Sequence, residues 1–152
     1  MIHISEEVHD AIAHHGEQTY PEECCGMMLG REIDGAPVVE ETIPIDNSQG
    51  ENRRRRFLVS PGQYLHAEQL AAERHLTLLG FYHSHPDHPA IPSAFDTTHA
   101  LPWFTYVIVS VVSDEAKNMT AWLLSDDRTH FIERTIVLEP SPVQRSLHQK
   151  EA

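Results

Sequence analysis

Two segments of the chain place apolar residues at the spacing of an α-helix. The first follows Ser5, whose hydroxyl can cap a helix, and it ends before Pro21. The second begins at Ser60-Pro61, where proline suits the first helical position, and it reaches about His75. We therefore expect a helix in each segment. The apolar side of the second helix is expected to comprise Tyr64, Leu65, Leu70 and Ala71.

Shorter apolar runs predict strands. They cover residues 25–30, 38–45, 57–59, 76–83, 106–112, 119–124 and 131–138. Asp34-Gly35 is typical of a hairpin turn, residues 114–118 are expected to form another turn, and residues 97–100 a short helical turn. The order of a helix, a hairpin, a helix and several strands predicts an α/β or α+β domain around one mixed β-sheet.

The composition is typical of one soluble globular domain. Of the 152 residues, 40% are hydrophobic and 22% are charged, and no apolar run is long enough to cross a membrane. Residues 139–152 are polar and contain two prolines, so we expect a loosely held tail there. We expect Trp103 and Trp122 to be packing residues rather than platforms for a substrate.

Neither a secretory signal nor a disulfide framework is visible in the sequence. The first residues lack both the basic segment and the apolar run of a signal peptide. The two cysteines, Cys24 and Cys25, are adjacent and cannot build a network of disulfides. These observations predict a cytoplasmic location.

The formal net charge of −12 makes nucleic acid a poor candidate partner, because such a surface repels phosphate backbones. The exception is the run Arg53–Arg56, which concentrates positive charge in a polar segment. This run is either a solvated loop of an acidic protein or a docking point for an acidic partner or substrate tail.

Three residues that commonly bind metals lie close together in the sequence. His83 and His85 end an apolar run, and on a strand residues two apart point to the same face. Asp96 follows within the next loop and would leave one position open for water, as in catalytic zinc sites. A simpler explanation also exists, because twelve histidines make such a pair unsurprising and Ser93 with Asp96 resembles a helix capping box. The two roles of Asp96 are compatible.

A hydrolytic metal site also needs a general base and a donor for the oxyanion of the tetrahedral intermediate. Ser93 could present its hydroxyl to that oxyanion, and the base must come from elsewhere in the chain.

Two motifs of this sequence resemble those of the JAMM (MPN-plus) zinc metallopeptidases. His83-Ser84-His85-Pro86 followed by Ser93-Ala94-Phe95-Asp96 matches the family's His-x-His-(seven residues)-Ser-x-x-Asp motif. Upstream, residues 21–30 resemble the segment Pro-x-Glu-x-Cys-Gly-x-Leu-x-Gly, with Met28 at the leucine position. The resemblance covers about residues 1–138. It implies a single JAMM/MPN-like domain whose curved central mixed sheet is flanked by helices, an architecture similar to that of cytidine deaminases.

The resemblance also assigns roles to individual residues. His83, His85 and Asp96 would bind one zinc ion per chain, and Ser93 would stabilise the oxyanion. Glu23 would be the general acid/base acting on the zinc-bound water. The spacing to the Cys-Gly pair selects Glu23 over its neighbour Glu22, which is expected to be an exposed loop residue.

Other side chains near the motifs have alternative roles. Cys25 is expected to be a small buried residue, although as a fourth zinc ligand it would make the site structural. Cys24 and Cys25 should point to opposite faces of a strand, so both are not expected to reach one metal ion. Asp87 and His88 are expected to be exposed loop residues, or else to line the cleft.

The implied activity is hydrolysis of the peptide or isopeptide bond that follows the C-terminal Gly-Gly of a ubiquitin-like protein. The short chain is similar to the stand-alone bacterial members of the family, whose substrates are often sulfur-carrier proteins. The substrate tail could add to a sheet edge beside the cleft. No nucleic acid or membrane partner is expected, and a dimer is compatible with the sequence.

Two other functions remain open: a non-catalytic MPN-type interaction module, and a RadC-like protein associated with DNA repair. The net charge of −12 and the upstream glutamate argue against the second. A cytidine deaminase would need a Pro-Cys-x-x-Cys ligand pair, which is absent from the sequence.

Overall fold

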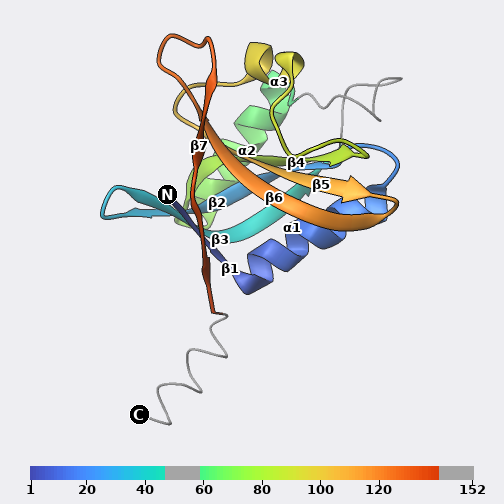
Figure 1. Ribbon diagram of the computed structural model, residues 1–152. Coiled ribbons are helices and arrows are strands. Elements are labelled where there is room, and N and C mark those ends of the chain that lie inside the picture. The colour runs from blue at the N-terminus through green and yellow to red at the C-terminus, as the bar shows by residue number, and fades with distance from the viewer. Residues whose placement is uncertain (47–58, 141–152) are drawn as a thin grey trace.

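The computed structural model describes residues 1–46 and 59–140, which form helices around one sheet (Figure 1). The helices in this part of the chain are α1 (Glu6–Thr19), α2 (Pro61–Glu73) and α3 (Ala94–His99). The strands are β1 (Ile2–Ser5), β2 (Cys25–Ile33), β3 (Ala36–Ile45), β4 (Thr77–Pro86), β5 (Thr105–Val112), β6 (Glu115–Leu124), β7 (Phe131–Arg134) and β8 (Ile136–Glu139). No helix among the described residues is long and apolar enough to span a bilayer.

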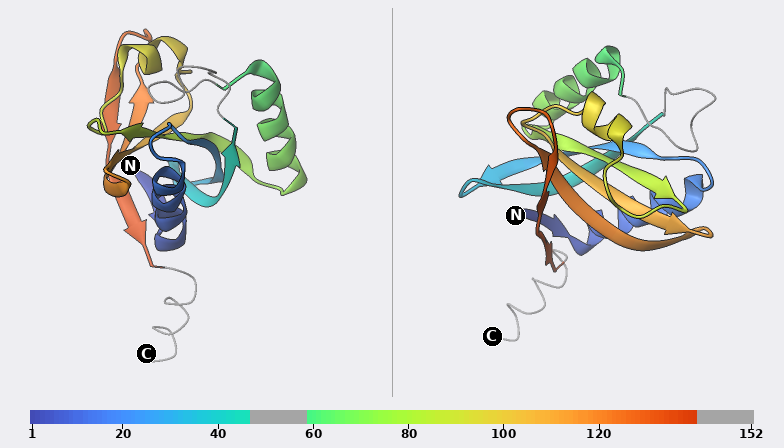
Figure 2. Two further views of the ribbon diagram at one scale, coloured as in Figure 1. Left: turned by 90° about the vertical axis from the view of Figure 1, so that its right-hand side faces the viewer. Right: turned by 45° about the horizontal axis from the view of Figure 1, so that its top comes forward.

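The eight strands follow the order β7-β6-β5-β4-β2-β3-β1-β8. β7 and β8 are separated only by Thr135, so one extended segment pairs with β6 at one edge of the sheet and with β1 at the other. The sheet therefore curls until it is nearly closed (Figure 2). β4 runs parallel to β5 and antiparallel to β2. The expected α+β single domain with a curved mixed sheet is confirmed.

Each face of the sheet packs against different helices. α1 lies on one face, where Val8 and Ile12 join a core that includes Met28 and Tyr82. α2 lies on the opposite face, as the left view of Figure 2 shows, and its buried alanines contact a core around Phe81. β4 lies between these two cores, and every residue after Thr77 in this strand is buried. Side chains of β4 are therefore held rigidly from both sides.

Both long helices begin where the sequence predicts. The Ser5 hydroxyl accepts a 3.1 Å hydrogen bond from Val8 N–H, which satisfies one of the amides that a helix start leaves unpaired. Ser60 and Gln63 form a full capping box at the start of α2, with Pro61 at its first position. Leu65 was expected on the apolar side of α2 but is exposed.

Several local predictions were wrong. β1 was not predicted, and the turn expected at 114–118 covers only Ser113 and Asp114, whose φ values are 50° and 64°. Residues 115–118 instead form the beginning of β6. The helical turn starts at Ala94, before the expected position. Trp103 is 68% exposed and is therefore not a packing residue.

Some predictions fall outside the described residues. The Arg53–Arg56 run and the first two residues of the strand expected at 57–59 lie there, and Val59 belongs to no strand. Residues 141–152, most of the expected tail, also lie outside, whereas Glu139 ends β8. The boundary between a domain at 1–138 and a tail at 139–152 stays a prediction.

Candidate metal centre

The structure brings His83, His85 and Asp96 together in one buried cluster. His83 Nε2 lies 3.1 Å from His85 Nε2, and Asp96 Oδ2 lies 3.3 Å and 3.2 Å from these two nitrogens. Ligand bonds of 2.0–2.1 Å in a tetrahedral zinc site place neighbouring ligand atoms about 3.3 Å apart. The triangle formed by these three atoms therefore has the size of one face of a zinc tetrahedron, and the residues fit a zinc ion.

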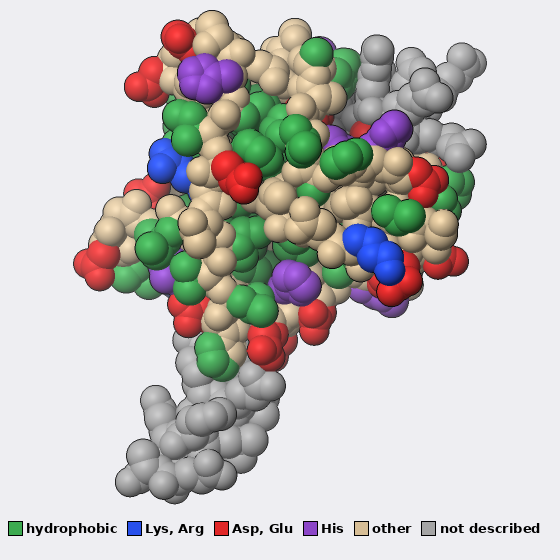
Figure 3. All heavy atoms as spheres, viewed as in Figure 1, with side chains coloured by type: hydrophobic (Ala, Val, Ile, Leu, Met, Phe, Trp, Pro, Cys, Tyr) green, Lys and Arg blue, Asp and Glu red, His purple; other side chains and the backbone are tan. Residues whose placement is uncertain are grey.

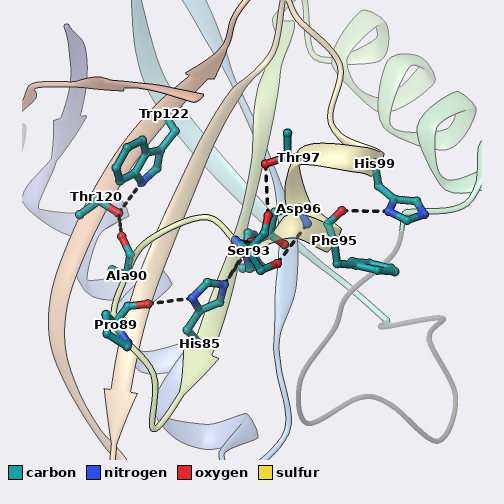
Figure 4. A network of polar contacts seen from close by, with 11 residues as sticks. His85, Pro89, Ala90, Ser93, Phe95, Asp96, Thr97, His99, Thr120 and Trp122 are labelled. Carbon is teal, nitrogen blue, oxygen red and sulfur yellow. Dashed lines mark hydrogen bonds and ion pairs between the residues drawn. The ribbon is translucent and has the colours of Figure 1, made fainter. Parts of the chain in front are cut away.

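The hydrogen bonding of His85 supports the same conclusion. Its Nδ1–H donates a 2.8 Å hydrogen bond to the carbonyl oxygen of Pro89, which can only accept (Figure 4). A neutral ring with its hydrogen on Nδ1 carries a lone pair on Nε2, the atom that faces His83 and Asp96. Metal-binding histidines are commonly fixed in this way by a carbonyl at the other nitrogen.

Asp96 has both of the roles considered from the sequence. It stands at the third position of α3, where its amide donates a 3.1 Å hydrogen bond to Ser93 Oγ. Its Oδ2 in turn accepts a 2.8 Å hydrogen bond from the amide of Ser93. That same oxygen faces the two histidines, so the capping box orients the carboxylate toward the cluster (Figure 4).

Burial and the neighbouring charges set the protonation of the cluster. Burial lowers the pKa of His83 and outweighs the opposite effect of Asp96, so the imidazole is neutral at neutral pH. Burial acts to raise the pKa of Asp96, but His83, His85 and the Ser93 amide together hold it below its usual range. Neutral imidazoles and an ionised carboxylate are the forms that bind zinc.

Glu23 and Ser93 open onto the same pocket as His85. This pocket has a volume of about 450 Å³ and is also lined by His88, Pro89 and Ile91. Glu23 itself is only 3% exposed. Burial, followed by the charge of Asp96, raises the pKa of Glu23 to about 9. The buried carboxyl can therefore hold a proton at neutral pH.

Glu22 is exposed, as expected, and lines a second pocket of about 390 Å³, which Glu23 also lines. His85 and Ser93 do not line that second pocket. The geometry therefore favours Glu23 over Glu22 as the glutamate of the site.

The two cysteines lie outside the cluster. Cys24 packs in the core beside α1 and Cys25 in the core beside α2, so they point to opposite faces, as predicted. Burial raises the pKa of Cys24 to about 11 and that of Cys25 to about 12. Protonated thiols are poor zinc ligands, so the structure favours three ligands and an open position.

The loop that carries Pro89 is also fixed from the side of β6. Thr120 Oγ1–H donates a 2.6 Å hydrogen bond to the carbonyl of Ala90, and Trp122 Nε1–H donates a 2.7 Å bond to Thr120 (Figure 4). Trp122 is half-buried and helps to hold this loop, which agrees with the expected packing role. Asp87 and His88 are exposed as expected, and His88 also lines the pocket of Glu23.

Sequence reasoning missed Ser84, which lies between the two histidines and points away from them. Ser84 Oγ accepts a 2.8 Å hydrogen bond from the amide of Cys24, and the Ser84 amide donates one of 3.1 Å to the Cys24 carbonyl. These bonds join the strand of the histidines to the residue that follows Glu23. The alternation of a strand could have identified Ser84 as the side chain on the opposite face.

Solved structures of other proteins share this fold. The solution structure of a protein from Desulfitobacterium hafniense has a TM-score of 0.81 and 28% identity, covering 93% of this chain and 94% of that chain. The solution structure of a protein from Salinibacter ruber has a TM-score of 0.72 and 42% identity, covering 93% of both chains. The crystal structure of a JAB1/MPN domain protein from Archaeoglobus fulgidus has a TM-score of 0.58 and 17% identity, covering 91% of this chain and 98% of that chain. The last similarity shows the fold alone.

Sequence comparisons give the family. Tail tip assembly protein K of Escherichia phage N15 is 34% identical over 98 residues, or 62% of this chain. The chain spans 36% of the length of that curated relative. A family profile described as "Prokaryotic homologs of the JAB domain" matches residues 5–125, a range that contains the cluster and its surroundings. The chain therefore belongs to the family of prokaryotic homologs of the JAB domain.

Proposed function

We propose that this chain is a zinc-dependent peptidase or isopeptidase of the JAMM type. The observation that carries the proposal is the convergence of His83 Nε2, His85 Nε2 and Asp96 Oδ2 to separations of 3.1–3.3 Å. Glu23 and Ser93, the other two residues of the motif, line the pocket that His85 also lines. A buried three-residue donor set beside an open pocket suits catalysis better than a purely structural role.

The chemistry follows from the protonation and hydrogen bonds of these residues. A zinc ion held by the cluster would supply a Lewis acid that lowers the pKa of a coordinated water to about 7. With zinc bound, whose positive charge favours the ionised carboxylate, Glu23 would take up a proton from that water and later deliver it to the leaving amine. The burial that raises its pKa favours the protonated carboxyl between these two steps. Ser93 Oγ accepts from the Asp96 amide, so its own hydrogen can donate to an oxyanion.

We propose that the substrate is a ubiquitin-like protein, in particular a sulfur carrier, cleaved after its C-terminal Gly-Gly. The support is the motif resemblance together with the shape of the site. A Gly-Gly tail has no side chains to collide with the walls of the pocket, so its backbone can approach the buried cluster. A cytoplasmic location remains part of this proposal.

A non-catalytic interaction module is the alternative that the family itself allows. The relative named as a tail tip assembly protein makes an assembly role a second candidate for this domain, since the two sequences match over 98 residues. A RadC-like role is disfavoured by the net charge of −12, and Figure 3 shows isolated basic side chains among more numerous acidic ones.

Mass spectrometry of a sulfur-carrier protein extended beyond Gly-Gly tests the proposal. The zinc-loaded wild-type protein should release the extension, and Glu23→Gln should retain its zinc but lose the activity. Glu22→Gln is the matched control, because Glu22 is exposed and lines the other pocket. Loss of activity in Glu22→Gln with full activity in Glu23→Gln would overturn the assignment. Absence of cleavage of any Gly-Gly-extended carrier would favour the non-catalytic alternative.

A further inference from the structure

The carboxylate of Asp87 joins three segments at the rim of the candidate metal centre. Its Oδ2 accepts a 2.6 Å hydrogen bond from the Tyr20 hydroxyl, and its Oδ1 accepts a 3.1 Å bond from the Ser113 amide. Tyr20 directly follows α1, Asp87 directly follows β4, and Ser113 begins the turn between β5 and β6. The carboxylate therefore links segments that are remote in the sequence.

The backbone of Asp87 is also fixed, by its conformation and by a hydrogen bond to β5. Its φ of 55° lies in the left-handed region, which aspartate tolerates better than most residues. Its amide donates a 2.7 Å hydrogen bond to the carbonyl of Val111. This conformation ends β4 and directs the chain into the loop of Pro89 and Ser93. The position of Asp87 thus sets where that loop departs from the sheet.

Tyr20, the partner of Asp87, is fixed by the end of α1. It caps α1 through a 3.1 Å hydrogen bond from its amide to the Gly16 carbonyl, and its ring packs against the core beside α1. Glu23 follows three residues later. The segment from Tyr20 to Cys24 is thus fixed at its inner end by the Cys24–Ser84 bonds and at its outer end by the Tyr20–Asp87 bond.

The end of α1 is held against the β5–β6 hairpin as well. Glu17 Oε2 accepts a 2.9 Å hydrogen bond from the Ala116 amide, and Figure 1 shows this end of α1 beside the tips of the two strands. The helix end, the hairpin turn and the start of the loop therefore form one connected rim around Asp87.

We propose that Tyr20 and Asp87 are positioning residues that hold the segment of Glu23 at a fixed separation from the loop of Ser93. The inference rests on the function proposed above, because proton transfer requires Glu23 within hydrogen-bonding reach of the reacting atoms. A misplacement of about 1 Å can cost two orders of magnitude in rate. Neither residue touches the substrate in this account, and both act through the backbone that carries Glu23.

Two substitutions remove the bond in complementary ways. Tyr20→Phe deletes only the hydroxyl and keeps the ring in the core. Asp87→Gly deletes the carboxylate and suits the positive φ. Asp114→Gly is the matched control, because Asp114 also has a positive φ of 64° and its carboxylate makes no hydrogen bond to any described residue.

Amide hydrogen exchange of the zinc-free protein, followed by NMR, gives a readout that does not depend on activity. Loss of the Tyr20–Asp87 hydrogen bond should make the Glu23 and Cys24 amides exchange about five times faster in Tyr20→Phe. Exchange should be at least as fast in Asp87→Gly, which also loses the bond to the Ser113 amide. The control should exchange like the wild type at these amides. Unchanged exchange in both test variants would overturn the proposal.

Kinetics of the zinc-loaded enzyme provide the second arm. Both test variants should lose about tenfold in kcat while KM and zinc content stay unchanged. The double variant should be no slower than Asp87→Gly, because the two substitutions remove the same bond. In a Glu23→Gln background neither substitution should lower the residual rate further, whereas a merely structural role would lower it equally in both backgrounds.

The two arms separate this inference from the proposed function. Faster exchange with an unaltered kcat would refute the positioning role while leaving the peptidase intact. A wild-type protein that cleaves no Gly-Gly-extended carrier would refute the proposed function, and with it the positioning role. The exchange experiment would then still show whether the bond orders the segment.

Discussion

Ser84→Ala should destabilise the fold more than the removal of an exposed serine hydroxyl would. Ser84 is fully buried and Cys24 is 2% exposed, so water cannot replace the lost acceptor. The Cys24 amide, which donates a 2.8 Å hydrogen bond to Ser84 Oγ, would remain buried without that partner. A buried donor left unsatisfied costs about 1–3 kcal/mol, so we expect a loss of about 2 kcal/mol in the free energy of unfolding.

Urea unfolding of the metal-free protein measures this loss, because no zinc then contributes to the midpoint. For a domain of this size the same change corresponds to a fall of about 6–8 °C in Tm. Ser84→Cys, which keeps a weak acceptor at this position, should lose less. A free energy of unfolding within about 0.5 kcal/mol of wild type for Ser84→Ala would contradict this prediction, since changes of that size are typical of surface substitutions.

Three further predictions concern packing, pH and capping. Gly26→Ala should lower the free energy of unfolding, measured with urea, by about 3 kcal/mol, because a Cβ at Gly26 would overlap the buried ring of Tyr82. Gly62→Ala is the control and should be nearly neutral, because its Cβ would lie 4.0 Å from its nearest neighbour. Burial lowers the pKa of His15 below 6.5, so below that pH the unfolded state binds more protons than the folded state, and urea midpoints should fall as the pH drops. His15→Gln should make the urea midpoint depend less steeply on pH. An equally steep dependence in that variant would contradict the assignment to His15. Ser60→Ala should lower stability by about 1 kcal/mol in thermal melts, since it removes the hydroxyl of the α2 capping box, and an unchanged Tm would exclude that contribution.

Elements with strong local signals could be predicted from the sequence. The caps at Ser5 and Ser60 marked both long helices, and Asp34-Gly35 marked the hairpin between β2 and β3. β1 was missed because it has only four residues and is stabilised by parallel pairing with β3 and β8, which lie far away in the chain. A turn was expected at 114–118, yet residues 115–118 are a polar, solvent-facing stretch of β6. Non-local pairing and one-sided exposure leave little trace in a single sequence.

At the candidate site, too, local patterns could be predicted from the sequence and contacts between remote segments could not. The histidine spacing and the capping box of Ser93 and Asp96 are local patterns, and they predicted which side chains meet. The Pro89 carbonyl that orients His85 could not be predicted, because the conformation of a proline-rich loop decides which carbonyl faces the ring. The bond between Tyr20 and Asp87 spans 67 positions and depends on how α1 packs against the sheet. Contacts of this kind become visible only in three dimensions.

Calorimetric titration of zinc into the metal-free protein tests whether the three clustered residues form a metal site. We expect one zinc ion per chain, bound by His83, His85 and Asp96, so His83→Ala and Asp96→Ala should abolish tight binding. Cys24→Ala and Cys25→Ala should bind zinc with unchanged stoichiometry. Full binding by the Asp96 variant together with loss of binding by either cysteine variant would contradict the proposed ligand set and the open site.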